Sequence, residues 1–568
     1  MEPTEHDKVS PDRGSPLRRW GPIVAILAVI AIVAAVSLIG GGGNGDETTA
    51  NESPTDTTPV RLPEGVVTWS MAERDGTVDD LNWPDGCDTE SGMVAIPFFF
   101  RTECFANVDD NGGATSDGVT GDTITVVAWL PAANDPIRGL LLNRVGYDQT
   151  NDELKRQYQG FVDVFQRYYQ TYGRRVELKF LESSGNLLDN TAARADAVKA
   201  DEELGAFAVL GGPLLASAWA DELHARGIVC VACPSVSKAA PSSFSLTMSQ
   251  GQARAHFINY VTRKLAGHPA EFAGDEELQS RDRVFGHLAL GMTDADERNA
   301  KRLKDELADE GVELAEQAIY PLDITGVSEQ AVSAITRMKQ AGVTTILLQG
   351  DPLSLVGITG EATKQEYFPE WVFQSGANFV DTVAFARSFD QRQWEHAFGI
   401  SFLPPLTDPD VNPPNVLYRW FHGESPPAND TVSILLSYPQ VALLFTGLEY
   451  AGPELTVETF RDGLFVAPPT PPSITQPSID YGEGIWDEPD YNGVDDMVEM
   501  WWDPTAEGRD ETGNEGRGMY RYVDGGKRYL AEEWTDEVKV FDPDGTVTEV
   551  TEVPPSEAPP DYPSPAAG

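Results

Sequence analysis

Hydrophobic and polar positions repeat in a strand, helix, strand pattern over most of this chain. The clearest unit begins with an apolar run at residues 207–210, continues through a Gly-Gly-Pro turn into a helical pattern with Leu215, Trp219 and Leu223, and ends in a second apolar run at 228–232. A parallel pair of strands needs such a crossover, which is right-handed in nearly all folds. The loops after both strands should therefore lie side by side at the carboxyl edge of one sheet, where ligands bind in open α/β sheets.

The same pattern extends in both directions from this unit. A buried strand begins at Thr123, an amphipathic helix with an aromatic stripe follows at 153–172, and strands and helices keep alternating after residue 247. Such alternation is typical of doubly wound parallel sheets. We therefore predict an α/β fold with two Rossmann-like lobes, lobe 1 at residues 121–246 and lobe 2 at 247–376. Residues 377–468 should return across both lobes.

The segments that flank the lobes have other patterns. Residues 61–120 mix short apolar runs with turns and should form a small prelude. Residues 469–552 are predicted to be a C-terminal extension with short strands, including a hairpin that turns at 524–526. The Pro-rich residues 553–568 are predicted to be a disordered tail.

The N-terminus predicts a membrane anchor. Residues 1–20 contain three arginines, an uncharged apolar stretch at 23–39 lies within a predicted transmembrane segment at 21–40, and the polar residues 41–60 are typical of a flexible linker. The positive-inside rule keeps the arginines cytoplasmic and places the bulk of the chain outside the cell. The alternative is a secretory signal that is cleaved near residues 35–37.

The four cysteines fall into two pairs. Outside the membrane thiols tend to oxidise, and Cys87 and Cys104 bracket a loop in the prelude, so we predict a disulfide between them. Cys230 and Cys233 have CxxC spacing but lie in and just after a predicted strand, where side chains three residues apart point to opposite faces. Buried apolar thiols are favoured there over a redox or metal site.

The balance of charge excludes some partners. The chain carries 90 acidic against 41 basic residues, a formal net charge of -49, which repels nucleic acid and anionic lipid headgroups. The acidic cluster Asp487, Asp490, Asp495 and Asp496 fits a solvated loop better than a metal site. We expect no metal and no cofactor.

Motifs of catalysis are missing from the sequence. It contains no GxSxG elbow, no HExxH, no phosphate-binding GxxxxGK[ST] and no GxGxxG that opens a helix after a strand, and its seven histidines are scattered. An enzyme is therefore not expected.

Four stretches carry a resemblance to a known family. They are residues 118–131 (GVTGDTITVVAWLP), 207–235 with its FAVLGGP and ARGIVCVACPS ends, 244–261 (FSLTMSQGQARAHFINYV) and 344–362 (TTILLQGDPLSLVGITGEA). In order and spacing they resemble the branched-chain amino-acid-binding proteins of ABC transporters, which have the type I periplasmic-binding-protein fold. The resemblance implies two lobes joined by a three-segment hinge that close on a small ligand.

Carried over position by position, the resemblance implies ligand contacts in both lobes. Gly211 and Gly212 would offer backbone amides to a ligand carboxylate, together with the hydroxyl of Ser217. The remaining implied contacts are Ser235, Ser237, Asp296, Gln349, Asp351 and Ser375. The family usually presents an aromatic residue near position 296 and a carboxylate near 375. This chain has neither, which leaves Asp296 or Asp351 as the partner of a ligand ammonium. Each of these positions also fits a turn or helix-cap role.

Together these features predict a membrane-anchored extracellular protein that captures a small polar solute, amino-acid-like or amide-like, for an ABC importer with its permease subunits. The alternative is a cell-surface sensing or interaction protein that keeps the fold without transport.

Overall fold

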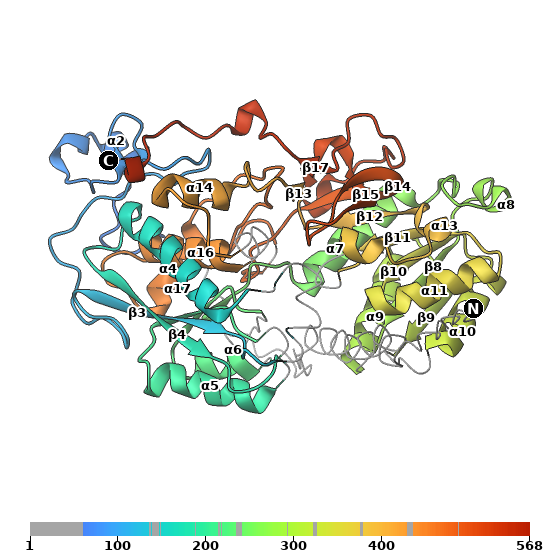
Figure 1. Ribbon diagram of the computed structural model, residues 1–568, viewed down its shortest axis with the longest axis horizontal. Helices are drawn as coiled ribbons and strands as arrows, with labels where there is room; N and C mark the ends of the chain where they lie inside the picture. Colours follow the sequence, from blue (N-terminus) through green and yellow to red (C-terminus); the bar gives the residue numbers. More distant parts are fainter. Residues whose placement is uncertain are drawn as a thin grey trace, which may run out of the picture.

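The computed structural model describes residues 61–135, 138, 147, 149–187, 189–213, 216, 218–234, 241–291, 294–321, 327–374, 379–428, 436–486 and 488–567. Within them the chain forms two α/β lobes that lie side by side (Figure 1). The mixed α/β fold with parallel sheets agrees with the sequence prediction.

Lobe 1 is built on a five-stranded parallel sheet. Its strands are β3 (Thr123–Leu130), β4 (Arg175–Glu182), β5 (Ala208–Leu210), β6 (Val229–Val231) and β7 (Ser243–Phe244), in the order β4-β3-β5-β6-β7. This is the doubly wound order 2-1-3-4-5. In the register of the sheet, Val126 of β3 lies between Leu178 and Ala208.

Helices cover both faces of this sheet because successive strand side chains alternate between the faces. Val126 and Ala128 face α4 (Asn151–Tyr168), α16 (Tyr438–Ala451) and α17 (Val457–Val466), and α14 (Pro413–His422) packs beside them. Val127 and Trp129 face α5 (Asn190–Glu202) and α6 (Ala218–Ala225). Thr150 and Glu153 form a capping box at the start of α4, as the amphipathic pattern and its polar start suggest.

Lobe 2 repeats the strand order and then extends it. Its sheet runs β15-β14-β12-β11-β10-β8-β9, and β16 pairs with β14. The bounds are β8 (Phe285–Leu290), β9 (Glu316–Tyr320), β10 (Thr345–Gln349), β11 (Glu370–Gln374), β12 (Ala397–Ser401), β14 (Met497–Arg509), β15 (Glu515–Tyr522) and β16 (Arg528–Tyr529). The strands β8 to β12 are parallel, whereas β14 and β15 are antiparallel additions.

Two layers of helices also cover the lobe 2 sheet. One face packs against α7 (Gln250–Tyr260), the π-helical turn Val261–Leu265 and α9 (Asp294–Asp309). The other face packs against α10 (Val327–Gln340), α11 (Pro352–Lys364), α12 (Val383–Ala386) and α13 (Gln391–Trp394), with α8 (Glu276–Gln279) at the rim.

The C-terminal extension is therefore part of lobe 2, and its hairpin differs from the predicted one. The turn between β14 and β15 lies at residues 510–514, where Asp510 accepts hydrogen bonds from the amides of Thr512 and Asn514. Residues 524–526 instead form a short turn from β15 into β16. The turn signal of Asp and Gly is present at both places, and only strand pairing distinguishes them.

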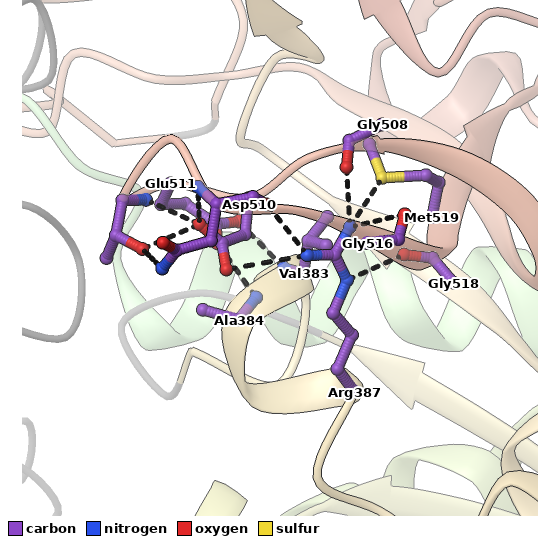
Figure 2. A network of polar contacts seen from close by, with 11 residues as sticks. Val383, Ala384, Arg387, Gly508, Asp510, Glu511, Gly516, Gly518 and Met519 are labelled. Carbon is purple, nitrogen blue, oxygen red and sulfur yellow. Dashed lines mark hydrogen bonds and ion pairs between the residues drawn. The ribbon is translucent and has the colours of Figure 1, made fainter.

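Arg387 and Glu511 fasten this hairpin to the rest of lobe 2 (Figure 2). The Arg387 guanidinium donates to the carbonyl oxygens of Gly508 (2.8 Å), Gly516 (3.1 Å) and Gly518 (3.1 Å). The Glu511 carboxylate accepts from the backbone amides of Val383 (2.7 Å) and Ala384 (2.9 Å) at the start of α12. Arginine suits this position because its planar fork can satisfy several carbonyl groups at once.

Three segments connect the lobes, as the resemblance implied. They are residues 245–249 between β7 and α7, 402–412 between β12 and α14, and 467–496 between α17 and β14. The first and third are hydrogen-bonded to each other, because the Ser245 amide donates to the Tyr491 carbonyl (2.8 Å) and the Gly493 amide donates to the Ser245 carbonyl (2.9 Å). The second carries β13 (Leu406–Thr407), which pairs with β17 (Glu549–Val550).

The prelude contains α2 (Trp69–Asp75), β1 (Cys87–Asp88) and β2 (Met93–Val94), and its predicted Cys87–Cys104 disulfide is confirmed. The end of the chain differs from the predicted disordered tail. After β17 it runs back to lobe 1 (Figure 1), where Tyr562 donates to Asp88 (2.7 Å) and its carbonyl accepts from Trp420 (2.9 Å). Proline restricts the unfolded chain, so a Pro-rich segment loses little conformational entropy when it becomes ordered. A few side-chain contacts are then enough to hold it in place.

Among the described residues, no helix combines the length and apolar character needed to cross a membrane, and the predicted segment at 21–40 lies outside them. In the same part of the chain, no group of three or more His, Cys, Asp or Glu side chains could hold a metal ion.

Candidate functional site: the interlobe cleft

The carboxyl ends of the strands in both lobes meet between the lobes. Leu290 is the last residue of β8, and Leu353 lies in the first turn of α11 directly after β10. Both leucines of lobe 2 pack against the apolar cluster of lobe 1 that includes Trp129, Leu187 and Trp219. This cluster is called the lobe 1 jaw cluster below. The contact places the ligand-binding edge of one sheet opposite that of the other.

In lobe 1, Gly211 and Gly212 form the turn after β5. Gly211 has a positive φ of 69°, its amide donates to the Val231 carbonyl (2.8 Å), and its carbonyl accepts from the Trp219 indole (3.0 Å). A Cβ on Gly212 would lie 2.4 Å from the indole nitrogen of Trp219. Both positions therefore require glycine for the turn and for the close approach of Trp219. The Gly211 amide is occupied by the sheet.

Cys230 and Cys233 form a disulfide at the neighbouring strand end, which corrects the expectation of free buried thiols. The strand β6 ends at Val231, and Ala232 has a positive φ of 55°. That backbone conformation turns the chain, so the rule that strand residues three apart face opposite sides no longer applies. Among the described residues no cysteine is free.

In lobe 2, Gln349 belongs to a chain of hydrogen bonds that crosses four strands. Gln317 of β9 donates to Nδ1 of His287 (2.9 Å), Nε2 of His287 donates to Gln349 (3.1 Å), and Gln349 donates to Gln374 of β11 (3.0 Å). His287 is fully buried, and burial lowers its pKa to about 4, so the imidazole is neutral. This neutral tautomer relays hydrogen bonds in one direction across the sheet, from Gln317 to the strand ends at Gln349 and Gln374.

Asp351 caps α11 and is fully buried. Its carboxylate accepts from the amides of Leu353 (3.0 Å) and Ser354 (2.8 Å) and from the Tyr320 hydroxyl (3.0 Å). Burial raises the pKa of this carboxyl, and these hydrogen bonds oppose the shift. The structure thus shows the cap role for Asp351, with both carboxylate oxygens already engaged by the protein.

Of the other predicted site residues, the structure describes Asp296. Asp296 lies in the first turn of α9 and is partly buried. Ser217, Ser235, Ser237 and Ser375 lie outside the described residues. Of the predicted set, the structure brings Gly211 and Gly212 together at one strand end, and Gln349 and Asp351 at another.

Two further polar residues at the lobe 1 edge were not predicted. Gln440 of α16 accepts from the Tyr158 hydroxyl (2.8 Å), and its amide nitrogen lies 3.1 Å from where a Cβ on Gly211 would be. Gln157 donates to Ser437 (2.7 Å) across the same pair of helices. For Gln440, the only sequence signal was a polar residue that interrupts the apolar pattern of α16. Its partner Tyr158 could not be predicted, because it lies in a distant helix.

The acidic cluster was predicted to be a solvated loop; Asp487 lies outside the described residues, and the other three aspartates, in the third interlobe segment, are not solvated. Asp490, Asp495 and Asp496 are all buried, and Asp495 is only 1% exposed. Asp496 pairs with Arg528 (2.7 Å), and Asp490 accepts from the amide of Asn492 (2.8 Å). Burial, with the nearby Asp490 and Asp480, raises the pKa of Asp495 to about 8, although a hydrogen bond from Trp486 opposes the shift. The segment is folded inward because it bonds to Ser245 and packs against α7.

No protein-family model and no curated protein sequence matches this chain. Solved structures do. One is an ABC transporter substrate-binding protein from Aeropyrum pernix, with 14% identity, a TM-score of 0.47 and coverage of 73% of this chain and 97% of that one.

Another is a branched-chain amino acid transporter substrate-binding protein from Streptococcus pneumoniae in complex with isoleucine (17% identity, TM-score 0.43, coverage 71% and 100%). A third is a fatty acid ABC transporter substrate-binding protein from Thermomonospora curvata (13% identity, TM-score 0.46, coverage 76% and 98%). The fold assignment itself rests on the two strand orders and the three interlobe segments. The resemblance to the type I periplasmic-binding-protein fold of branched-chain amino-acid-binding proteins is thus confirmed at the level of the fold.

Proposed function

We propose that this protein is a membrane-anchored extracellular solute-binding protein that captures a small polar solute, amino-acid-like or amide-like, between its lobes and delivers it to an ABC importer. The observation that carries the proposal is the meeting of two strand edges, at Leu290, Leu353 and the lobe 1 jaw cluster, in a chain with three interlobe segments. In open α/β sheets this edge binds ligands, and hinged lobes close around them.

The disulfides support the extracellular placement. Both cysteine pairs are oxidised, which is typical of proteins outside the cytosol. The proposed anchor is the apolar segment at residues 23–39, with the arginines before it on the cytoplasmic side. Protease treatment of intact cells that express the full chain should degrade the lobes and leave the first 20 residues protected.

The polar groups at the cleft edge of lobe 2 favour contact with an uncharged or amide-like part of the solute. The amides of Gln349 and Gln374 lie at adjacent strand ends, while the Asp351 carboxylate is engaged by Tyr320 and the start of α11. Because Asp351 is fully buried, a ligand ammonium would have to displace the groups around it to reach the carboxylate. We therefore do not assign the ammonium role to Asp351, and Asp296 remains the other predicted partner of a ligand ammonium.

A ligand screen tests the proposal. The full chain in detergent is heated with amino acids, their amides, short peptides and polyamines, and a ligand that binds the native state raises the unfolding temperature. Each hit is then followed by small-angle X-ray scattering, where closure of the lobes should lower the radius of gyration. A well-folded protein that responds to none of these solutes would count against the proposal.

The second candidate is a cell-surface sensing or interaction protein. A hollow of about 490 Å³ lies on the outer side of lobe 1, lined by α4, the edge strand β4 and Phe421, with charged residues of both signs. This hollow is separate from the cleft and favours a second binding surface. Affinity purification from membranes distinguishes the two functions, because recovery of permease subunits supports delivery and their absence from a stable complex favours sensing.

A further inference from the structure

Trp129 combines a buried indole N–H with a place at the cleft edge. It is the second-to-last residue of β3, the strand between β4 and β5, and is only 7% exposed. Its side chain lies in the lobe 1 jaw cluster, on the α5 and α6 face of the sheet. Among the described residues its indole nitrogen has no hydrogen-bond acceptor.

Such a buried donor requires an explanation, because nearly all buried polar atoms are hydrogen-bonded and buried tryptophans usually find an acceptor. Trp219 shows the ordinary case in the same cluster, since its indole donates to the Gly211 carbonyl (3.0 Å). Other buried tryptophans behave likewise, for example Trp371 with Gln393 (3.1 Å) and Trp502 with Gln391 (2.8 Å).

Trp501 also has an indole nitrogen without an acceptor. It lies in β14, paired with Phe398 of β12, with Arg521 5.8 Å from its ring, and it belongs to a cluster on the α7 and α9 side of lobe 2. Trp129 differs because its cluster is the one that Leu290 and Leu353 of the opposite lobe contact. Trp129 lies one residue before the carboxyl end of β3, at the edge where open α/β sheets bind ligands, whereas Trp501 lies within the antiparallel strand β14.

We infer that Trp129 is a ligand-binding residue whose indole N–H donates to a carboxylate or carbonyl oxygen of the solute, while an apolar part of the solute lies against Leu290 and Leu353. The inference rests on the proposed function and narrows it to solutes with an acceptor oxygen on an apolar body. The indole supplies a rigid donor, and the two leucines of lobe 2 complete an apolar wall only when the lobes approach each other.

Isothermal titration of the full chain in detergent tests this inference with three probes of one shape. The probes are 4-methylpentanoate and 4-methylpentanamide, which carry an acceptor oxygen, and 4-methylpentan-1-amine, which carries none. We expect the wild type to bind the acid or the amide and to bind the amine at least about tenfold more weakly. Trp129→Phe keeps an aromatic ring but removes the donor, so it should weaken binding of the acid or amide about tenfold. Trp501→Phe, the matched control, should leave binding unchanged.

A spectrum of the indole N–H groups gives a second readout that does not depend on the stability of a variant. The signal missing in Trp129→Phe identifies Trp129, and in the wild type this signal should move downfield when the acid or amide is added, while that of Trp501 stays in place. Equal affinities of wild type and Trp129→Phe, or a Trp129 signal that does not move, would overturn the inference. So would a wild type that binds neither the acid nor the amide. If other solutes of the broader screen still bind, the proposed function stands without the inference about Trp129.

Discussion

Lobe 1 and lobe 2 have the same strand order, but they bury different kinds of side chain around it. In lobe 1, α16 packs against α4 through aromatic rings, such as Phe161 with Tyr438 and Phe165 with Phe445, whose centroids lie 5.7 Å apart in both pairs. In lobe 2, ion pairs are buried, among them Arg283 with Glu370 (2.8 Å) and Lys264 with Glu499 (2.6 Å).

The C-terminal extension explains part of this difference. Glu499 lies in β14, which the extension adds to the lobe 2 sheet, and its carboxylate is buried against Lys264 and the Tyr260 hydroxyl (2.8 Å). A strand added to an existing sheet carries its polar side chains into the interior, and each then needs a partner. Lobe 1 receives helices with mostly apolar inner faces, and its buried Glu449 of α16 accepts a hydrogen bond from the Gln170 amide (3.0 Å). We therefore expect the buried ion pairs of lobe 2 to make its stability depend on pH.

The largest effect is expected for Lys264→Met. Removing the cation leaves Glu499 buried without its charge partner, so we expect a loss of about 4 kcal/mol of unfolding free energy at pH 8. Burial already raises the pKa of Glu499, and loss of Lys264 raises it further, so protonation at pH 5 should restore part of the loss. Urea unfolding of the wild type and the variant at both pH values measures this loss of unfolding free energy.

The double variant Lys264→Met with Glu499→Gln is the control for this pair. It removes both charges, so it should be more stable than Lys264→Met alone at pH 8. Equal stability of the single and double variants would show that lost packing, and not the unpaired carboxylate, causes the effect.

Phe161→Leu in lobe 1 should have a smaller effect. Phe161 is fully buried between Tyr418 and Tyr438, and the smaller side chain leaves a gap that we expect to cost about 1.5 kcal/mol. Because no charge is exposed or buried, the loss should be the same at pH 5 and pH 8. Hydrogen exchange should rise in β3 and α4 and not in β14, and a change confined to lobe 2 would contradict the comparison.

The smallest effect concerns the interlobe segment, where Asp495→Asn should stabilise the protein by about 1 kcal/mol at pH 8. The unfolded chain releases the Asp495 proton near pH 4, whereas the folded chain, with a pKa of about 8, keeps it. The folded state therefore binds more protons between these values, and its stability falls as pH rises through them. Asparagine has no proton to lose, so the gain should grow from pH 4 to pH 8. Thermal unfolding over this range measures it.

Asp88→Asn is the control of opposite sign. Hydrogen bonds from Ser91 and Tyr562 lower the pKa of Asp88 to about 2, so its carboxylate stabilises the folded state above pH 4 and this contribution disappears as pH falls toward 2. The variant should lose stability at neutral pH. A gain for both variants would indicate a general effect of reducing the net charge.

Local patterns were enough to predict much of the fold. The unit from β5 to β6, the amphipathic α4 and the Cys87–Cys104 pair follow from periodicity and spacing, because their partners are close in sequence. Less of the candidate site could be predicted from the sequence. Its strand ends could be named from the pattern, but Gln440 meets Tyr158 and Gly211 only because α16 returns to lobe 1 after the chain has built most of lobe 2.

The sequence by itself determined the two doubly wound lobes and the strand edges that could bind a ligand, since periodicity and chain direction constrain these features. The three interlobe segments were implied by the family resemblance. Only the tertiary structure decided that β14 completes lobe 2, that Ala232 turns Cys230 toward Cys233, that Asp351 is held by Tyr320, and that the cluster containing Trp129 meets two leucines of the other lobe. These depend on groups far apart in the chain, whose hydrogen bonds and contacts exist only after the lobes have packed.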